Sequence, residues 1–253
     1  MAGGAVAIQA LQAGKLDIIY TAHDTPLRAR AQGFDVVIIA NQNNAQQKPP
    51  DAAALLVRTD SDIRSPKDLE GKRVLVNTLH NVNWAYTREA VVRAGGDPGK
   101  IRFLEVPFPQ MVDALLGGQG EAASMTEPFT TIGVGTGKLR VLSYMFVEVQ
   151  PGLNIAGWAA RGGWAREHSK AVATFRQVVQ KAMDSLEQDP RAKTNAVLKF
   201  TQIKPELLAR ITLDRWTTRL DVNDLRKQLE LYTRHGMIDK AYAIDSVLFM
   251  PER

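Results

Sequence analysis

The sequence predicts an α/β protein built from two lobes that face a shared cleft. The first observation is the segment Ala123–Phe129, a short apolar run that reaches Glu127 and then a proline. Proline cannot donate to a sheet ladder, so we expect the strand to end there, with Glu127 and Phe129 at its carboxyl edge, where open α/β sheets place small ligands. The second is a similar unit upstream, in which a helical pattern at Ala7–Gly14 precedes the apolar run Lys15–Ala22. Two copies of this arrangement indicate two α/β lobes.

Strand and helix patterns alternate through the first 150 residues. Several strand patterns are unbroken runs of Val, Ile and Leu, which is typical of strands covered on both faces. The expected strands are Asp17–Thr21, Val36–Ala40, Ala54–Arg58, Arg73–Asn77, Arg102–Val106, Ala123–Thr126 and Leu139–Met145. The expected helices between them are Thr25–Gln32, Asn83–Ala94 and Pro109–Leu116. This alternation predicts parallel or mixed sheets with helices packed on both faces.

Glycine, proline and polar residues mark the ends of these elements. Ser65 followed by proline predicts the start of a short helix, which Gly71 ends. Pairs of glycines at 95–96 and 117–118 are expected to end the two longer helices. The segment Asn41–Asp51 is rich in Asn, Gln and Pro and is expected to be a polar loop.

After Gly163 the pattern becomes helical. Apolar residues recur at helical spacing from Val172 to Leu186. Further helices are expected at Ala192–Phe200, Pro205–Ile211 and Val222–His235. We expect this tail to be entirely helical and to cover the sheet of the first lobe.

Composition excludes several classes of function. The chain of 253 residues has a net charge of +5 but no run of Lys and Arg of the kind that binds nucleic acid. It contains no cysteine, which excludes disulfides, thiolate metal sites and cysteine nucleophiles. No apolar run approaches the ~18 residues of a membrane helix. The first residues also lack the basic head and long apolar stretch of a signal peptide.

Motifs of catalysis are missing or fail on inspection. The segment Gly133–Leu139 contains Gly-Lys, but it lacks the spacing of a phosphate-binding loop and precedes a strand, so we interpret it as a glycine-rich turn. The four histidines are widely spread, and neither His-Glu-x-x-His nor Gly-x-Ser-x-Gly occurs. His168 and His235 lie among charged helical residues and are expected on the surface. We expect no catalytic residue, no cofactor and no metal site.

A polar turn follows the expected strand Arg73–Asn77. It contains Thr78, His80, Asn81 and Asn83 at the start of a helix, where free N–H groups and the helix dipole favour negative charge. The next residue, Trp84, could stack on a ligand. Alternatively, Asn81 or Asn83 caps the helix and the tryptophan belongs to the core. The residues leave both interpretations open.

The matching turn of the first lobe follows the strand Asp17–Thr21. It contains Thr21, His23, Asp24 and Thr25. Asp24 or Thr25 could cap the next helix, and His23 and Asp24 could point into the cleft.

The order of three motifs resembles that of a known family. Ala10–Ile18 reads Ala-Leu-Gln-Ala-Gly-Lys-Leu-Asp-Ile, Leu56–Val74 ends in Ser-Pro-Lys-Asp-Leu-Glu-Gly-Lys-Arg-Val, and Glu127 begins Glu-Pro-Phe. Together they resemble the nitrate/sulfonate/taurine-type substrate-binding proteins of ABC transporters, a group to which thiamine-precursor binders also belong. The likeness covers most of the chain.

The resemblance implies a periplasmic binding protein type II fold, in which two lobes joined by two crossings close on the ligand like a hinge. We expect the crossings near Arg58 and near Asn154–Trp158, so that residues 1–58 and 157–253 form lobe one and residues 59–156 form lobe two. The implied function is the solute-binding component of an ABC importer, with a permease as its partner and no catalytic role. A periplasmic or lipid-anchored location would require a signal peptide before this start.

The implied ligand is a small anionic or aromatic molecule of the sulfonate, carboxylate, nitrate or pyrimidine class. By position, its contacts are Thr21 to Thr25, Thr78 to Asn83, Glu127 and, from the return crossing, Asn154. Thr78, His80 and Asn81 would donate hydrogen bonds, and Trp84 or Phe129 would supply apolar walls. Glu127 either accepts from an amine or ring nitrogen, or braces its turn by bonding backbone N–H groups, in which case a sulfonate or carboxylate is favoured.

The chain departs from the family pattern at its beginning. Family members begin with a signal peptide, a strand and a helix, whereas this chain starts inside that helix, at about Ala5. We therefore expect lobe one to lack its first strand and to expose an edge that a second copy of the chain, in a homodimer, or a shifted segment covers. Two other functions remain: an enzyme resembling thiamine-pyrimidine synthase, which the lack of cysteine disfavours, and a ligand-sensing effector domain, which needs a DNA-binding module.

Overall fold

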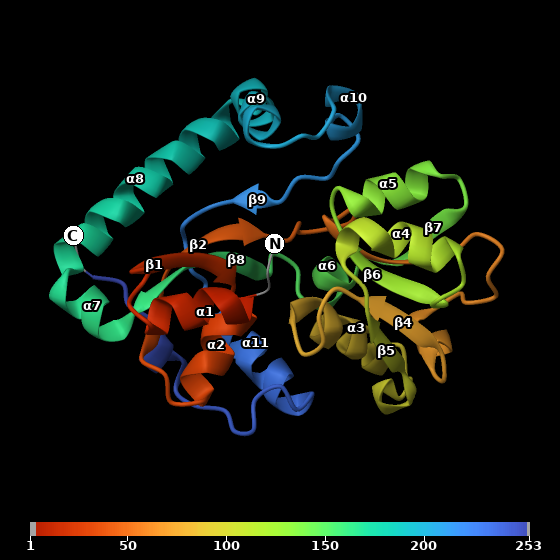
Figure 1. Cartoon of the computed structure of the whole chain (residues 1–253), viewed down its shortest axis with the longest axis horizontal. Helices are drawn as coiled ribbons and strands as arrows, with labels where there is room; N and C mark the ends of the chain where they lie inside the picture. Colours follow the sequence, from red (N-terminus) through yellow and green to blue (C-terminus); the bar gives the residue numbers. More distant parts are fainter. Residues whose placement is uncertain (1–3, 252–253) are drawn as a thin grey trace. The chain divides into compact units, whose positions relative to one another are not determined.

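The computed structural model describes residues 4–251, which form two compact units (Figure 1). Unit 1 comprises the described parts of 1–44, 154–190 and 215–253, and unit 2 comprises 45–153 and 191–214. The strand β3 (Ala53–Arg58), which we expected to end lobe one, lies in unit 2 because it pairs with β6 (Ala122–Thr126) and β7 (Leu139–Ser143).

Unit 2 is built on a five-stranded mixed sheet, as the alternation of strands and helices predicted. Its strand order is β5-β4-β6-β3-β7, where β4 is Arg73–Val76 and β5 is Arg102–Glu105. Strand β4 runs parallel to both β5 and β6, whereas β3 runs antiparallel to β6 and β7. The parallel strands β4 and β6 therefore end at the same edge of the sheet.

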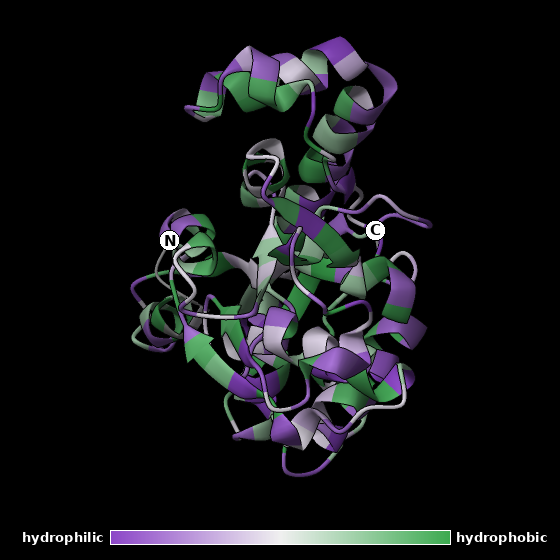
Figure 2. Cartoon of the chain, turned by 90° about the vertical axis from the view of Figure 1, so that its right-hand side faces the viewer, coloured by the Kyte–Doolittle hydropathy of each residue, from purple (hydrophilic) through white to green (hydrophobic). Residues whose placement is uncertain are grey.

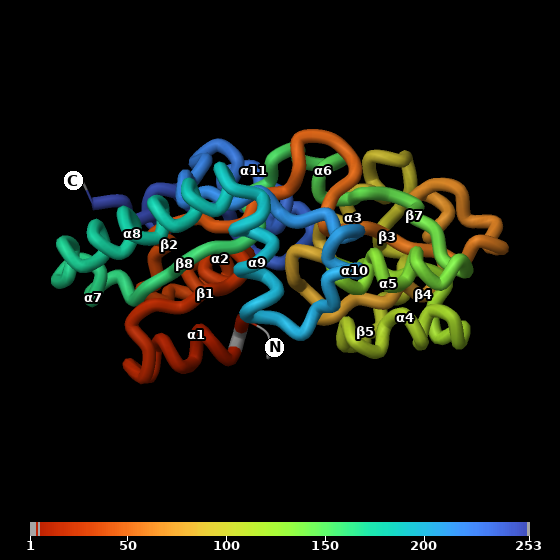
Figure 3. Tube along the Cα trace, turned by 90° about the horizontal axis from the view of Figure 1, so that it is seen from above, coloured from red at the N-terminus to blue at the C-terminus, as the bar shows by residue number. Residues whose placement is uncertain are grey.

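Helices cover both faces of this sheet. Helix α4 (Phe108–Leu116) packs on one face through its apolar side chains, and α3 (Val82–Arg93) lies on the other, where Asn83 bonds Ser124 of β6. Figure 3 shows these helices from above, together with α5 (Phe129–Gly135) and α6 (Met145–Val149). The shorter helical segments of this part of the chain are η1 (Pro66–Leu69), η2 (Pro98–Lys100), α9 (Pro190–Phe200) and α10 (Pro205–Leu208). Helix α3 ends as predicted at a glycine, because Gly95 adopts a φ of +78°, which side chains disfavour.

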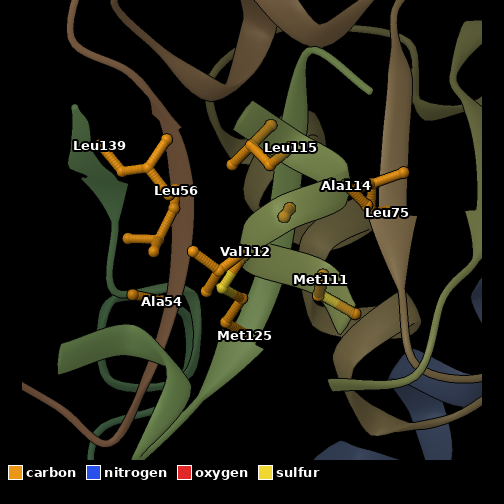
Figure 4. Close-up of a cluster of buried hydrophobic side chains, with 10 residues drawn as sticks. Ala54, Leu56, Leu75, Met111, Val112, Ala114, Leu115, Met125 and Leu139 are labelled. Atoms are coloured by element: carbon orange, nitrogen blue, oxygen red, sulfur yellow. The ribbon is translucent and has the colours of Figure 1, made fainter. Parts of the chain in front are cut away.

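The alternation of side chains along β6 divides the unit 2 core. Ala123 and Met125 of β6 pack against Met111, Val112 and Leu115 of α4. Figure 4 shows Met125 and these three side chains of α4 together with Leu56 and Leu75. Ser124, which points to the other face, bonds a side chain of α3. A two-residue period is what a strand covered on both faces requires.

Unit 1 contains a four-stranded sheet in which every pairing is antiparallel. Its order is β1-β8-β2-β9, with β1 at Ile18–Ala22, β2 at Val36–Asn44, β8 at Asn154–Arg161 and β9 at Arg215–Trp216. The prediction of a parallel or mixed sheet is wrong here because β8, which we expected to be a hinge crossing, lies between β1 and β2. Strand β2 also continues through Asn44, into the segment expected to be a loop.

Helices again lie on both faces of the sheet. Residues of α1 (Gly4–Gln12) and α2 (Asp24–Ala31) share one apolar cluster with β1, and residues of α7 (Gly162–Glu167) and α8 (Ser169–Gln188) share another with β2 and β8. The remaining helices are α11 (Val222–Arg234) and η3 (Ile244–Val247). Figure 2 shows apolar residues, in green, concentrated along the strands and polar residues, in purple, in many of the helices and loops.

Three expectations for single segments need correction. The tail is not entirely helical, because β9 pairs with β2. The glycine-rich segment after Ile132 is a turn only in its second part, since α5 continues to Gly135. His235 is buried rather than on the surface, because α11, which it ends, packs against α2 and η3.

Strand β1 lies at an edge of the unit 1 sheet. The loss of a preceding strand and the covering of this edge by a second copy both stay predictions. Within residues 4–251 no helix combines the length and the apolar character that crossing a membrane requires.

Candidate functional site

Two predicted turns of unit 2 lie at one edge of its sheet. Because β4 and β6 are parallel neighbours, the loop after β4, which holds Thr78 and His80, and the turn at Glu127 after β6 leave the sheet on the same side. The loop after β4 is tied to β5, since the Leu79 N–H donates to the Glu105 carboxylate at 2.6 Å. Both Thr78 and His80 are exposed. This edge therefore presents polar groups to solvent, as the strand pattern predicted.

Asn81 caps the helix that starts at this edge. Its Oδ1 accepts the Trp84 N–H at 3.0 Å, and its amide donates to the Asn77 side chain at 2.9 Å. Asn83 is buried and donates to Ser124 Oγ at 3.1 Å, which fastens α3 to β6. In the described part of the chain, the backbone N–H groups of Val82 and Asn83 have no acceptor. The first turn of α3 thus keeps donors for an anion.

Trp84 is 6% exposed and is covered by protein groups. Its ring centroid lies 4.6 Å from that of His80 and 5.7 Å from that of Phe103, and the Arg88 guanidinium lies 4.6 Å above it. The structure thus has Asn81 as a cap and Trp84 in the core. Unlike Trp84, His80 is exposed to solvent, and its backbone has a φ of +54°.

Glu127 braces its own turn. Its carboxylate accepts the Thr131 hydroxyl at 2.7 Å, the Thr131 N–H at 3.0 Å and the Thr212 N–H at 3.3 Å. Burial raises the pKa of this half-buried carboxyl, against the effect of these donors. Phe129 stacks on Phe108, with ring centroids 5.9 Å apart, and packs against the unit 2 core.

A pocket of about 250 Å³ lies beside Glu127, entirely within unit 2. Its wall includes Asp51, Thr130 and Tyr144, which the sequence did not suggest as site residues. Asp51 is 1% exposed, and its Oδ1 accepts the N–H groups of Gln46 at 3.0 Å and Ala52 at 2.9 Å. Burial raises the pKa of Asp51, opposed by nearby backbone N–H groups.

The polar turn of unit 1 brings two threonine hydroxyls together. The first described residue of α1, Gly4, packs so closely that a Cβ there would lie 2.1 Å from Thr25 Oγ1 and 2.8 Å from Thr21 Oγ1. Thr21 is buried and Thr25 is half-buried. These two side chains remain candidates for ligand contact.

His23 is directed into unit 1. It is 1% exposed, and its Nε2 lies 2.9 Å from Asn41 Oδ1. Burial lowers the pKa of His23 to about 4, against the opposing effect of Asn41, so the ring is neutral near pH 7. A Cβ at Gly157 would lie 2.8 Å from His23 Cε1 and 2.3 Å from Ala40 O, so only glycine fits this point of β8.

Asp24 and Asn154 also have internal roles. Asp24 is 4% exposed, and burial raises its pKa to about 7 although Arg28 acts in the opposite direction. Asn154, 2% exposed, fastens β8 to α11: its Oδ1 accepts the Asp221 N–H at 2.8 Å and its N–H donates to the Asp224 carboxylate at 3.0 Å.

A larger pocket, of about 700 Å³, lies in unit 1 between α8, the loop after β9 and the segment at Met250. None of the predicted site residues lines it, but Arg176, Lys181 and Arg219 do. Among residues 4–251 no group of three or more His, Cys, Asp or Glu side chains could hold a metal ion.

Comparison with known proteins gives a family and a fold. A family model described as NMT1/THI5 like matches residues 1–193. No curated protein matches the chain.

Solved structures with the same architecture share little sequence with the chain. The periplasmic aliphatic sulphonate binding protein SsuA from Escherichia coli has a TM-score of 0.82 and 18% identity, over 98% of this chain and 84% of that one. The alkanesulfonate-binding protein SsuA from Xanthomonas axonopodis pv. citri, bound to MOPS, has a TM-score of 0.81 and 17% identity, over 99% and 86%. The desulfurization enzyme DszB is more distant, with a TM-score of 0.67 and 13% identity over 92% and 82%. The chain has the periplasmic binding protein fold.

Proposed function

Because the chain belongs to the NMT1/THI5-like family, we propose that it is the solute-binding component of an ABC importer and binds a small organic anion. The solute-binding role is supported by the fold that the chain shares with sulfonate-binding proteins of importers. Its partners are then the solute and a permease, and its place of action is outside the inner membrane.

The single observation that carries the anionic class is the start of α3. The Oδ1 atom of Asn81 accepts the Trp84 N–H, whereas the backbone N–H groups of Val82 and Asn83 have no acceptor among the described residues. The exposed side chains of Thr78 and His80 adjoin them. Unpaired N–H groups at a helix N-terminus bind sulfonate, carboxylate or phosphate oxygens because the helix dipole adds to their positive partial charges.

The contacts of Glu127 support the same class. A carboxylate that accepted from the ligand would require an amine or ring nitrogen there. In this chain the Thr131 N–H, the Thr131 hydroxyl and the Thr212 N–H already bond it. Because these three donors already bond Glu127, the ligand does not have to supply an N–H group at this position. This favours a sulfonate or carboxylate over a pyrimidine.

Within unit 1, the hydroxyls of Thr21 and Thr25 lie close together beside Gly4. His23, Asp24 and Asn154 are nearly fully buried, and we assign them to positioning the strands and helices of unit 1 rather than to ligand contact. Asn83 and Trp84 support the α3 turn in the same way from within unit 2.

Calorimetric titration with representative compounds tests the class. The panel is an alkanesulfonate, an alkanecarboxylate, nitrate and a pyrimidine, each at matched ionic strength. We expect saturable binding of the sulfonate or the carboxylate and a matching rise in melting temperature. Chromatography of the bound compound should recover it unchanged, since turnover would favour an enzyme of this fold.

Asn81→Asp locates the site. Aspartate is as good an N-cap as asparagine, and Asn77 can turn its NH₂ group toward the new carboxylate to replace the bond that the Asn81 amide donates, so α3 should keep its stability. The new charge would repel an anion at this turn by about 1–4 kcal/mol at ~4 Å. We expect at least about tenfold weaker binding. The matched control is Asn223→Asp, which adds the same charge to the first turn of α11. Equal affinity of the two variants would contradict the assignment of the anion to α3.

A further inference from the structure

We propose that the pocket formed by Asp51, Glu127, Thr130 and Tyr144 in unit 2 binds a small aliphatic amine in its ammonium form. None of these residues belongs to the α3 turn to which the organic anion was assigned. The inference does not depend on the identity of that anion.

The first argument is that two polar atoms of the pocket wall lack a partner. Asp51 and Thr130 are 1% and 4% exposed, yet Asp51 Oδ2 and Thr130 Oγ1 make no hydrogen bond within the part of the chain that the structure describes. The backbone N–H of Val147 is close enough to the Asp51 carboxyl to lower its pKa, although burial outweighs this effect. Asp51 and Thr130 both line the pocket. A buried polar atom without a partner is costly, so such atoms in native proteins usually face a ligand, an ion or water.

The second argument is the unbalanced negative charge around the pocket. Burial, and then the charges of Glu127, Glu148 and Asp51, raise the pKa of the Tyr144 phenol, so three carboxylates lie within electrostatic range of one side chain. The cationic side chain on the wall is Arg210, which is exposed. Among the described residues it forms no ion pair with any of these carboxylates. A bound cation would offset this charge.

The third argument distinguishes an amine from a metal ion. The pocket has two carboxylates on its wall, and no group of three or more possible metal-binding side chains exists within residues 4–251. Its volume of about 250 Å³ is several times that of a water molecule, about 30 Å³. An ammonium group offers three donors for Asp51 Oδ2, Thr130 Oγ1 and a third acceptor. Pro50, Val134 and Val141 supply an apolar wall for its alkyl chain, and the Tyr144 ring can contact the cation.

The test uses n-butylammonium chloride as the probe in isothermal titration calorimetry of the whole chain, with no organic anion ligand added. Butan-1-ol has the same chain without the charge, sodium chloride controls for ionic strength, and calcium chloride tests a metal. We expect saturable binding of n-butylammonium alone. Absence of saturable binding to the wild-type chain, or saturable binding of calcium without that of the amine, would overturn the proposal.

The decisive variant is Asp51→Asn. Its side-chain oxygen can still accept the N–H groups of Gln46 and Ala52, but an NH₂ donor replaces the unpaired Oδ2. We expect at least tenfold weaker amine binding, because the variant removes the negative charge of the pocket wall and replaces an acceptor by a donor. The matched control Asp62→Asn removes the same charge from an exposed position and should bind like the wild type.

Thr130→Val is a second variant of similar shape that lacks the hydroxyl, and we expect it to weaken amine binding at least threefold. It keeps the test decisive if Asp51→Asn does not fold. Wild-type affinity in either folded variant would overturn the proposal, whatever the outcome of the anion titrations.

Discussion

Two adjacent buried residues of unit 1, His23 and Asp24, should give opposite dependences of stability on pH. Burial lowers the pKa of His23 from 6.5 to about 4 and raises that of Asp24 from 3.8 to about 7. The folded chain therefore holds both side chains neutral at mildly acidic pH, whereas the unfolded chain charges both. As pH falls from 7 to 4, the unfolded state gains a proton on the histidine and the folded state gains one on the aspartate.

The two contributions are similar in size. A tenfold difference in proton affinity corresponds to about 1.4 kcal/mol, so each group changes the free energy of unfolding by about 3 kcal/mol between pH 7 and pH 4. The lowered pKa of His23 makes its contribution unfavourable as pH falls below 6.5. The raised pKa of Asp24 makes its contribution favourable over the same range, because the penalty of a buried charge disappears. In the wild type the two should nearly cancel.

Single variants separate them. Asp24→Asn leaves the histidine alone, so we expect its stability relative to wild type to fall by about 3 kcal/mol between pH 7 and pH 4. His23→Gln leaves the aspartate alone, and its relative stability should rise by a similar amount. Urea denaturation at pH 7, 5.5 and 4 measures both, and the comparison with wild type removes the contribution of other carboxylates. If both variants follow the wild-type pH profile in parallel, the burial argument for this pair is refuted.

Three further changes test the packing by urea denaturation. Gly157→Ala should cost about 3 kcal/mol, because its Cβ would meet the backbone oxygen of Ala40 at 2.3 Å; wild-type stability would contradict the close approach of β8 to β2. Leu56→Ala should cost about 2–5 kcal/mol, since this side chain is fully buried, whereas Val178→Ala, at a site 60% exposed, should cost less than about 0.5 kcal/mol. Asn154→Ala should cost about 1–3 kcal/mol by leaving the Asp221 N–H without its acceptor, and a smaller loss would mean that α11 is held to β8 by other contacts.

The sequence predicted unit 2 more accurately than unit 1. All five strands of unit 2 were expected within two residues of their observed ends, because most are short apolar runs closed by glycine, proline or polar residues. Strand β8 was missed because its small and glycine residues become a strand only between β1 and β2, which lie far away in the sequence. The polar end of β2 was missed for the same reason: Asn41 bonds Asn44 and the Thr217 carbonyl, and only the folded chain supplies that second partner.

The candidate site divides in a similar way. The turn before α3 was predictable because a polar segment between a strand and a helix is a local pattern, but the sequence left open whether Asn81 caps the helix or contacts a ligand. The burial of His23 was not, since it depends on Asn41 and on the missing side chain of Gly157. The pocket at Asp51 could not be predicted, because Thr130, Tyr144 and Arg210 reach it from separate parts of the chain.

The position of β8 between β1 and β2 also constrains the order of events during synthesis. Strands β1 and β2 leave the ribosome before β8, and each pairs with β8 and not with the other. The whole segment 45–153 is translated in between. Until β8 is made, the part of β2 that holds Val37 and Ile39 lacks the strand with which it pairs. These two side chains therefore stay exposed to solvent while the first segment of unit 2 leaves the ribosome. The segment that holds β1 and β2 should thus be made well before it acquires its native pairing with β8.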